Sequence, residues 1–421
     1  MKLLVSAYAC APNRGSDLGV GWNWTTEAHK LGHEIWALVS PAHRNAIAAA
    51  CRENPGLNGI HWLFPEVKAW PLRQGIEPRW ERTYNLLWQY SALAHARPLH
   101  RRVRFGAVHH VTWAGIRAPT FLGALKIPLI IGPIGGGETS PGPLRDELGT
   151  RGRILEKTRD LSSATIAINP VVSPGLNRAC VIFVCTEDTR NLFTGALREK
   201  MVVFTPLGIS ALPPAHGPRT WRGPPKFLFT GRLLYWKGAH IAIRAFAEVA
   251  RKIPGAGLTI VGDGHERSRL EQTAKRYDVQ HSVAFISRLP QAELFELYRS
   301  HDFFLFPSLH DSGGFVVLEA LSYGMPVICL DLGGPRDIVT PNSGIVVETR
   351  GRDTAEVAAA MGDEILRLCA APSRAAALSE GAIARAADFL LPDRVKRFYE
   401  IAESRIEVER DMAANPHRAY A

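Results

Sequence analysis

The chain has 421 residues, of which 46% are hydrophobic and 21% are charged, a composition typical of an ordinary globular protein. One hydrophobic core rarely covers so many residues, so we expect two domains. No apolar run reaches the roughly 18 residues of a membrane-spanning helix. The six cysteines show no CxxC motif and no paired zinc spacing, so we expect neither a disulfide nor a metal site from them.

The formal net charge is +10, and half of this excess lies in residues 65–105. The basic residues of this segment are Lys68, Arg73, Arg79, Arg82, Arg97, Arg101, Arg102 and Arg104. Between them lie the aromatic residues Trp70, Trp80, Tyr84, Trp88 and Tyr90. Two interpretations stay open: peripheral contact with an anionic membrane or a lipid-linked acceptor, or a solvated helix pair whose aromatic rings pack into a core. No nucleic-acid-binding module is recognisable, so we predict no nucleic-acid partner.

Short apolar runs alternate with amphipathic segments, the pattern of parallel sheets covered by helices. Residues 1–10 superficially resemble a short signal peptide, but a first strand explains them better, and we predict a cytoplasmic protein. In the first half, strands are expected near 2–8, 34–39, 60–64, 107–112, 128–132 and 181–185, and helices near 20–31, 42–53, 79–97, 117–125 and 187–198. In the second half, strands are expected near 202–205, 226–230, 257–261, 282–286, 302–306, 326–330 and 345–347. Helices are expected there near 237–251, 264–277, 291–299, 314–324 and 353–370, followed by a helical tail from 374 to 412.

A proline- and glycine-rich stretch at 206–225 interrupts both kinds of pattern and predicts a domain boundary. We therefore predict an α/β protein of two doubly wound domains, residues 1–205 and 206–385, that face each other across a cleft. Residues 140–165 are irregular in pattern and predict a mobile loop or an extra helix.

Three glycine-containing segments follow predicted strands: Gly15–Gly21, Gly231–Gly238 and Asp311–Glu319. Ligands of open α/β sheets bind beyond the carboxyl ends of the strands, where these segments lie. If a helix begins near Gly314, its first backbone N–H groups form an anion site that the helix dipole reinforces. A Gly-Gly turn with a helix-stabilising glutamate would need no ligand, so spacing alone leaves this open.

Arg232 and Lys237 favour the ligand interpretation. An arginine fork suits two phosphate oxygens, and a lysine supplies a compact charge. Together they would neutralise charge on a departing diphosphate, and Glu319 would accept hydrogen bonds from the two ribose hydroxyls. The combination predicts transfer of a group from a nucleotide diphosphate.

Motifs in both halves carry a resemblance to a known family. In the second half they are residues 229–238 (FTGRLLYWKG), 261–271 (VGDGHERSRLE), 311–328 (DSGGFVVLEALSYGMPVI) and Leu332–Pro335. In the first half they are residues 9–24 (ACAPNRGSDLGVGWNW), 31–41 (LGHEIWALVSP), 108–119 (VHHVTWAGIRAP) and 130–138 (IIGPIGGGE). The resemblance is to retaining GT-B glycosyltransferases of group 1, or family 4. It implies an acceptor-binding N-terminal domain, a donor-binding C-terminal domain, and a helix over 386–421 that crosses back to the first domain.

The resemblance also implies roles for single residues. The donor-binding residues would be Gly15, Ser16, Gly19, Gly231, Gly313, Gly314, Phe315, Val316 and Glu319, and the catalytic ones Arg232, Lys237, Asp311, His109 and His110. Asp311 stands where the family carries the first glutamate of a Glu-x7-Glu pair, one methylene longer, so the contact to the donor sugar is open. Which histidine faces the cleft is open as well. Glu138 is an acceptor-side candidate, and an exposed acid on a glycine turn is its alternative.

The resemblance implies an enzyme of the hexosyltransferase type. Its donor would be a UDP-, GDP- or ADP-sugar, with no metal or other cofactor. Its acceptor would be a glycan or a lipid-linked molecule, as in exopolysaccharide, lipid-linked oligosaccharide or glycolipid assembly. A catalytically weak sugar-nucleotide-binding protein and a GT-B epimerase or phosphorylase are the alternatives.

Overall fold

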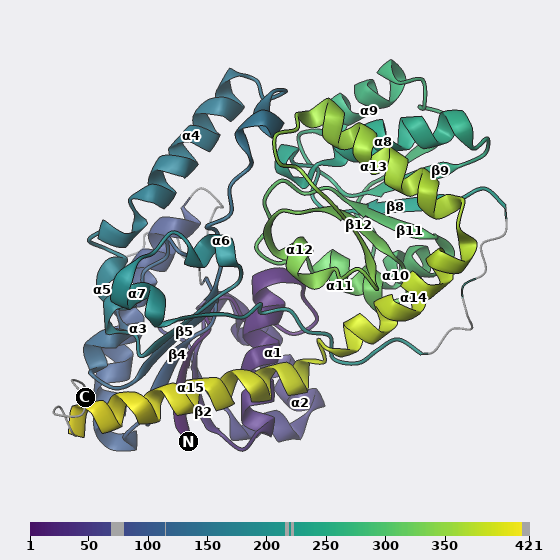
Figure 1. Ribbon diagram of the computed structural model, residues 1–421. Coiled ribbons are helices and arrows are strands. Elements are labelled where there is room, and N and C mark those ends of the chain that lie inside the picture. The colour runs from purple at the N-terminus through teal and green to yellow at the C-terminus, as the bar shows by residue number, and fades with distance from the viewer. Residues whose placement is uncertain (69–79, 114, 215–218, 220–222, 415–421) are drawn as a thin grey trace. The chain divides into compact units, whose positions relative to one another are not determined.

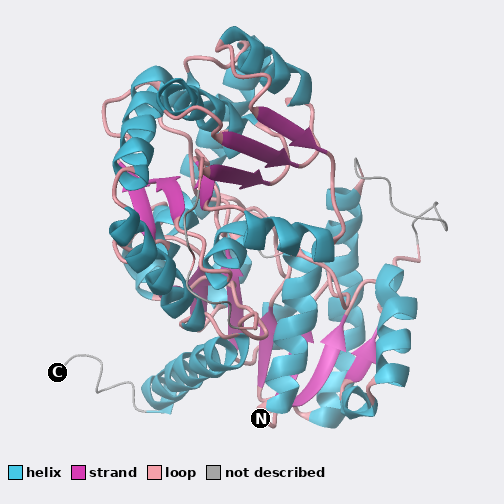
Figure 2. Cartoon of the chain, turned by 90° about the vertical axis from the view of Figure 1, so that its right-hand side faces the viewer, coloured by secondary structure: helices cyan, strands magenta, loops and turns pink. Residues whose placement is uncertain are grey.

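The computed structural model describes residues 1–421 except 69–79, 114, 215–218, 220–222 and 415–421. The chain divides into two compact units, each built on one parallel sheet. The first unit comprises residues 1–137, 162–206 and 391–421, and the second comprises residues 138–161 and 207–390. Figure 1 labels the elements, and Figure 2 shows the strands of each sheet lying among helices. Each unit is described by itself.

The sheet of the first unit has seven strands in the order β3-β2-β1-β4-β5-β6-β7, and every neighbouring pair is parallel. The strands are β1 (Lys2–Ser6), β2 (Glu34–Leu38), β3 (His61–Leu63), β4 (Ala107–His110), β5 (Leu129–Ile134), β6 (Val181–Val184) and β7 (Met201–Val203). All residues of β4, β5 and β6 are buried, as in a sheet covered on both faces, which is why these segments read as continuous apolar runs. The strand order reverses between β1 and β4.

The helices of the first unit cover this sheet (Figure 1). They are α1 (Ser16–Lys30), α2 (Arg44–Glu53), α3 (Glu81–Val103), α5 (Ser173–Arg178), α6 (Glu187–Arg190), α7 (Gly195–Glu199) and α15 (Leu391–Ala414). Short 3-10 turns are η1 (Pro41–His43), η2 (Pro55–Gly59), η3 (Leu122–Leu125) and η5 (Ile166–Ile168). Helix α15 packs on the unit through Phe398, whose ring lies 4.7 Å from that of Trp24 and 3.9 Å from that of Phe183.

The second unit repeats the same plan with six strands in the order β10-β9-β8-β11-β12-β13, again all parallel. The strands are β8 (Lys226–Thr230), β9 (Gly257–Val261), β10 (Val283–Ile286), β11 (Phe303–Phe306), β12 (Val327–Leu330) and β13 (Gly344–Val347). Phenylalanines from β8 and β11 stack in its core, as Phe227 does on Phe303 and Phe229 on Phe306. The order reverses between β8 and β11, so the carboxyl ends of these two strands are where a ligand is expected.

Helices lie on both faces of the second sheet, with α8, α9 and α13 on one face and α10, α11 and α14 on the other (Figure 1). They are α8 (Ala239–Lys252), α9 (Arg267–Arg276), α10 (Gln291–Ser300), α11 (Phe315–Ser322), α12 (Gly333–Ile338), α13 (Thr354–Cys369) and α14 (Pro372–Ala387). The turn η6 (Tyr235–Lys237) precedes α8. Two further elements, η4 (Gly142–Arg145) and α4 (Thr150–Ala164), precede β6 in sequence, and residues up to Leu161 belong to this unit.

Several predicted elements differ from the structure. The helix predicted over 117–125 is only the 3-10 turn η3, and the helix predicted over 187–198 is broken into α6 and α7. The strand predicted near 202–205 is β7, which pairs with β6 at the edge of the first sheet rather than in the second half. The helical tail is two helices, α14 and α15, since residues 388–390 interrupt it. Helices α5 and α12 were not predicted, because six-residue helices carry too little periodicity to recognise.

Residues 138–161 form the largest departure from the predicted organisation. Sequence order assigns them to the N-terminal domain, whereas they cluster with the second unit. Leu144 and Leu148 are 0% and 8% exposed and belong to the second unit's hydrophobic core, which anchors the segment there. The irregular stretch predicted at 140–165 thus contains one 3-10 turn and helix α4.

Within the parts of the chain that the structure describes, none of the helices combines the length and the apolar character needed to cross a bilayer. In the basic segment 65–105, Trp70, Arg73 and Arg79 lie outside the described residues. Its described aromatic residues fall into two classes: Tyr84 and Trp88 are buried in the first unit's core, whereas Trp80 and Tyr90 are 44% and 58% exposed.

Candidate functional site

Two loops of the second unit meet beyond the carboxyl ends of β8 and β11, where the strand order reverses. The first loop runs from Gly231 to Gly238, and the second from Pro307 to Gly314. The Trp236 carbonyl accepts hydrogen bonds from the Leu309 N–H at 2.7 Å and from the Ser308 hydroxyl at 3.0 Å. The loops are therefore held together before any ligand arrives.

Gly238 permits this close approach. Its φ of +74° is a left-handed conformation that side chains disfavour, and a Cβ atom there would lie 1.8 Å from the Pro307 carbonyl oxygen. Any other residue would push the two loops apart.

The two predicted cations both lie at this edge. Lys237 forms an ion pair with Asp311, and its ammonium lies 5.4 Å from the centre of the Phe306 ring. Asp311 also accepts a hydrogen bond from the Gly313 N–H at 3.3 Å. Arg232 lies two residues after β8 and is exposed, and its guanidinium has no hydrogen-bond or ion-pair partner among the described residues. One cation is thus fixed beside a carboxylate, while the other is available to an anion.

Backbone N–H groups complete the anion site. Helix α11 is capped by Gly314, whose φ is +105°. The Gly314 carbonyl accepts from Val317 and Leu318, whereas the N–H groups of Gly314, Phe315 and Val316 have no acceptor within the described part of the chain. Unpaired N–H groups at a helix N-terminus attract anions such as phosphate.

Glu319 lies one turn further along α11. Its carboxylate accepts a hydrogen bond of 3.1 Å from the Tyr298 hydroxyl, which lies 3.1 Å from the hydroxyl of Thr230 at the end of β8. Burial raises the pKa of Glu319 to about 7, and the Tyr298 hydrogen bond only partly offsets this. The site therefore holds a carboxyl group that titrates near neutral pH. Sequence reasoning missed Tyr298, which no motif marks.

Glu138 is 1% exposed and contacts this same site. Its carboxylate accepts a hydrogen bond of 2.5 Å from the hydroxyl of Ser312, the residue after Asp311. The sequence placed Glu138 on the acceptor side, or on a glycine turn as an exposed acid. The second alternative is wrong, because the side chain is buried against the second unit's loop.

In the first unit, the loop after β1 leads to Gly15, the N-cap of α1. Helix α1 begins at Ser16, so Gly19 and Gly21 lie inside the helix rather than in a loop before it. A Cβ atom at Gly19 would lie 2.2 Å from the Arg14 carbonyl oxygen, and one at Gly21 would lie 2.0 Å from that of Ala9. Gly19 and Gly21 therefore allow the residues before α1 to fold back against the helix. Of the glycines at 15, 19 and 21, only Gly15 lies at the helix N-terminus.

His109 and His110 end β4 and point to opposite faces of the sheet, as successive strand residues do. His109 is 0% exposed; its Nδ1 lies 2.8 Å from the Tyr399 hydroxyl and its Nε2 lies 2.9 Å from the Gly132 carbonyl oxygen. Burial lowers the pKa of His109 to about 3 despite the hydrogen bond to Gly132. Both ring nitrogens of His109 thus have partners, Gly132 on β5 and Tyr399 on α15.

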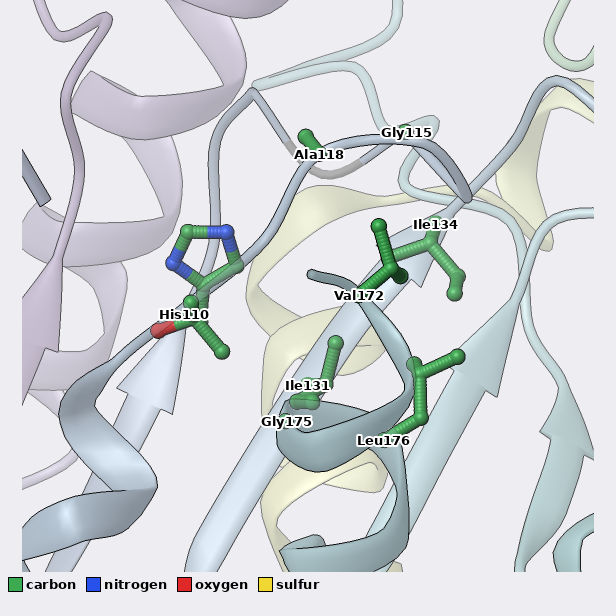
Figure 3. Close-up of a pocket in the computed structure, with 9 residues that line it drawn as sticks. His110, Gly115, Ala118, Ile131, Ile134, Val172, Gly175 and Leu176 are labelled. Atoms are coloured by element: carbon green, nitrogen blue, oxygen red, sulfur yellow. The ribbon is translucent and has the colours of Figure 1, made fainter. Parts of the chain in front are cut away.

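His110 faces a narrow pocket of the first unit (Figure 3). Its Nδ1 lies 3.2 Å from the Ser6 hydroxyl, and its Nε2 has no partner within the described residues. Burial lowers the pKa of His110 to about 4, so the ring is neutral at physiological pH. The remaining pocket residues are Gly115, Ala118, Thr120, Ile131, Ile134, Val172, Gly175 and Leu176. Of the two histidines, His110 is therefore the one with a ring nitrogen that has no partner among the described residues.

The structure thus brings together Gly231, Arg232, Lys237, Asp311, Gly313, Gly314, Phe315, Val316, Glu319 and Glu138 within the second unit. Gly15, Ser16, Gly19, His109 and His110 belong to the first unit. No cluster of three or more His, Cys, Asp or Glu side chains suited to a metal ion occurs in the described ranges. That the reaction needs no metal stays a prediction.

Comparison with known proteins agrees with this architecture. Residues 218–382 match the family model described as "Glycosyl transferases group 1". The chain is 34% identical over 192 residues to a glycogen synthase of Mycobacterium tuberculosis, an alignment that covers 45% of this chain and 46% of that protein. The chain spans about half the length of the curated relatives it matches first.

Solved structures resemble nearly the whole chain. Sucrose-phosphate synthase from Thermosynechococcus elongatus superposes with a TM-score of 0.64 at 17% identity, over 96% of this chain and 98% of that one. The Anabaena protein HepE in complex with UDP gives a TM-score of 0.61 at 15% identity, over 96% and 100%. Similarity at this level of identity shows only the fold. The fold is GT-B, with two parallel sheets of seven and six strands.

Proposed function

We propose that this chain, whose residues 218–382 match the group 1 glycosyl transferases and whose fold is GT-B, transfers a sugar from a nucleotide-diphosphate sugar to an acceptor hydroxyl. The anomeric configuration would be retained, as in the retaining members of the family that the sequence resembles. One observation carries the proposal. The Arg232 guanidinium, the Lys237 ammonium and three N–H groups at the start of α11 all lie at the switch point of the second sheet. Among the residues that the structure describes, neither the guanidinium nor these N–H groups have a hydrogen-bond partner.

These groups suit a nucleoside diphosphate. The N–H groups of Gly314, Phe315 and Val316 would bind phosphate oxygens, and Arg232 would add a forked contact. The Glu319 carboxylate would accept hydrogen bonds from the two ribose hydroxyls. The Tyr298 hydroxyl, 3.1 Å from a Glu319 carboxylate oxygen, would fix its orientation. The bound UDP was seen in HepE, a different protein. For this chain, UDP, GDP and ADP are the three candidate nucleotides.

In the proposed chemical step, negative charge develops on the leaving diphosphate, and cationic groups lie at the site to stabilise it. The bond between the anomeric carbon and the diphosphate oxygen breaks, and its electron pair goes to the diphosphate. The acceptor oxygen forms the new bond on the same face, and its proton leaves to a diphosphate oxygen. Positive groups that are already in place stabilise the developing negative charge without reorganisation. Lys237 has three N–H donors, so it can serve both Asp311 and a phosphate oxygen.

By resemblance to the family pattern, Asp311 would contact the transferred sugar. It is one methylene shorter than the glutamate of that pattern, and it is paired with Lys237. This pairing is the observation that favours the second candidate, a sugar-nucleotide-binding protein of weak turnover. Hydrolysis of a sugar donor in the absence of an acceptor would exclude that candidate, and product analysis with labelled donor would separate transfer from epimerisation or phosphorolysis.

The acceptor is proposed to be a glycan or a lipid-linked molecule at the cytoplasmic face of a membrane, as in exopolysaccharide, lipid-linked oligosaccharide or glycolipid assembly. Exposed basic residues along and after α3 support a peripheral contact with anionic lipid, together with exposed Trp80 and Tyr90. These basic residues are Arg82, Arg97, Arg101, Arg102 and Arg104. Sedimentation with anionic vesicles over a salt series tests this contact. If the protein does not bind the vesicles at low salt, the proposed membrane contact is wrong.

Thermal-shift screening tests the proposed donor site. A ligand that binds only the native protein stabilises it by RT ln(1 + [L]/Kd), where [L] is the ligand concentration, and so raises its melting temperature. We expect one of UDP, GDP or ADP to raise the melting temperature of the wild type and to lose this effect in Arg232→Ala. If no nucleoside diphosphate stabilises the wild type, the proposal is wrong.

A further inference from the structure

Residues 138–161 precede the linker by more than forty positions, yet they pack on the second unit; we call them the strap. They connect to the second unit at several points besides the loop that carries Asp311. The Leu144 carbonyl accepts from the Tyr235 hydroxyl at 2.5 Å, and the Asp146 carboxylate accepts from the Thr354 hydroxyl at 2.5 Å. Glu147 forms ion pairs with Arg244 and, at 3.4 Å, with Arg269. The strap is therefore a fixed part of this unit.

Two buried carboxylates of the strap touch the loop that carries Asp311. Glu138 accepts from the Ser312 hydroxyl at 2.5 Å, and a carboxylate oxygen of Glu156 lies 3.4 Å from Nε2 of His310. The side chains of Glu156 and His310 are 10% and 7% exposed. These contacts fall on the residues immediately before and after Asp311.

The strap residues are themselves held in place. Arg159 donates to the Glu138 backbone carbonyl through Nε at 3.1 Å and Nη2 at 2.9 Å. Arg145 pairs with Asp160 through two hydrogen bonds of 2.6 and 3.0 Å and lies 3.7 Å from Glu156. On the other side, the His310 ring stacks on Trp236 at 5.3 Å, next to Lys237. Rigid supports of this kind fix the geometry of a reacting group.

We propose that Glu138 and Glu156 are positioning residues, which hold the 310–312 backbone so that Asp311 meets the donor sugar while paired with Lys237. This inference rests on the proposed function. It assigns a role in the sugar-transfer step to a segment that lies outside the 218–382 match. Because Glu138 contacts Ser312 and Glu156 lies beside His310, the two neighbours of Asp311, their loss should affect turnover more than nucleotide binding.

The first test needs no substrate. Hydrogen exchange over residues 309–313, where the Leu309 and Gly313 amides donate hydrogen bonds, is compared in the full chain for wild type, Glu138→Ala, Glu138→Gln and Glu147→Gln. Removing a hydrogen bond between a hydroxyl and a charged group should speed exchange in this peptide by about tenfold in Glu138→Ala. Glu138→Gln keeps an acceptor oxygen for Ser312 and should remain close to wild type. Glu147→Gln, the matched control, loses a strap ion pair that does not touch the loop, and should leave this peptide unchanged. Equal exchange in Glu138→Ala and wild type would overturn the proposal.

The second test uses turnover and a double-mutant cycle between Glu138 and Ser312. We expect Glu138→Ala and Ser312→Ala each to lower kcat about tenfold, and the double variant to lose no more than either single one, because both remove the same contact. The Kd for the nucleoside diphosphate should not change. Additive losses in the double variant, or a parallel loss of nucleotide affinity, would contradict a positioning role. A wild type that turns over no sugar donor would refute the proposed function instead, and the exchange experiment would still decide the role of the strap.

Discussion

Replacement of Glu319 by glutamine probes a carboxyl group of the proposed donor site whose pKa is raised. The pKa of Glu319 is raised from 4.5 to about 7, chiefly by burial. The folded protein therefore keeps a proton on this carboxyl over a pH range in which the unfolded chain has lost it. Stability falls as pH rises through this window, because the unfolded state binds fewer protons there.

The size of the effect follows from the two pKa values. Their difference corresponds to at most about 3 kcal/mol of unfolding free energy lost between about pH 4.5 and pH 7. Solvent screening reduces this figure, since Glu319 is only partly shielded from water. His109, His110 and His240 have lowered pKa values, so their contribution to stability rises with pH instead. The difference between wild type and Glu319→Gln cancels the histidines and isolates Glu319.

The assay is thermal unfolding of both proteins at a series of pH values from 4.5 to 8.5, with and without nucleoside diphosphate. Without ligand, we expect the variant to gain stability relative to wild type as pH rises to 7 and then to keep a constant difference. With ligand, the wild type should bind more tightly as pH passes 7, since ribose hydroxyls donate to the ionised carboxylate, a contact worth about 1.5–3 kcal/mol. The variant should lack this gain. Parallel pH curves for the two ligand-free proteins would refute the assigned pKa, and a pH-independent difference in affinity would refute the ribose contact.

Further substitutions test other parts of the structure. Arg232→Ala and Lys237→Ala should each lower turnover by roughly two to four orders of magnitude, because each loses stabilisation of the leaving group. Wild-type steady-state kinetics in either variant would refute the assignment of that residue to the donor site. Gly238→Ala should destabilise the protein by about 2 kcal/mol or more, because φ is +74° and the methyl group meets a carbonyl oxygen, and an unchanged melting temperature would show that the loops relax. Tyr399→Phe should cost about 1–3 kcal/mol, since it removes the hydroxyl next to the buried His109 Nδ1, while kcat stays unchanged if His109 is structural.

The fold was largely predictable from the sequence because parallel strands buried on both faces read as short apolar runs. β5, β8 and β12 each lie where such a run predicted them. The motif at 311–319 likewise predicted the start of α11 to within one residue, since Gly314 caps it. Such patterns can be recognised because they depend on neighbouring residues and not on contacts with distant segments.

Contacts between distant segments could not be predicted. Nothing near Tyr298 indicates that its hydroxyl reaches Glu319 across 21 positions. The pattern at 138–161 gives no sign that Leu144 and Leu148 belong to the core of the second unit, because an apolar side chain does not encode which sheet it covers. The adjacent histidines were equally ambiguous, since their roles depend on what packs on each face of β4, and α15 supplies His109's partner from 290 positions away.

The central claim is that a nucleoside diphosphate is bound at the switch point of the second sheet by main-chain amides and two cations. A crystal structure of the full chain with bound UDP, GDP or ADP, whichever stabilises it, tests this most directly. We predict phosphate oxygens within hydrogen-bond distance of the Gly314, Phe315 and Val316 N–H groups and of Arg232, and ribose hydroxyls at Glu319. A nucleotide bound away from the start of α11, or one that leaves Arg232 and Glu319 without contact, would contradict it.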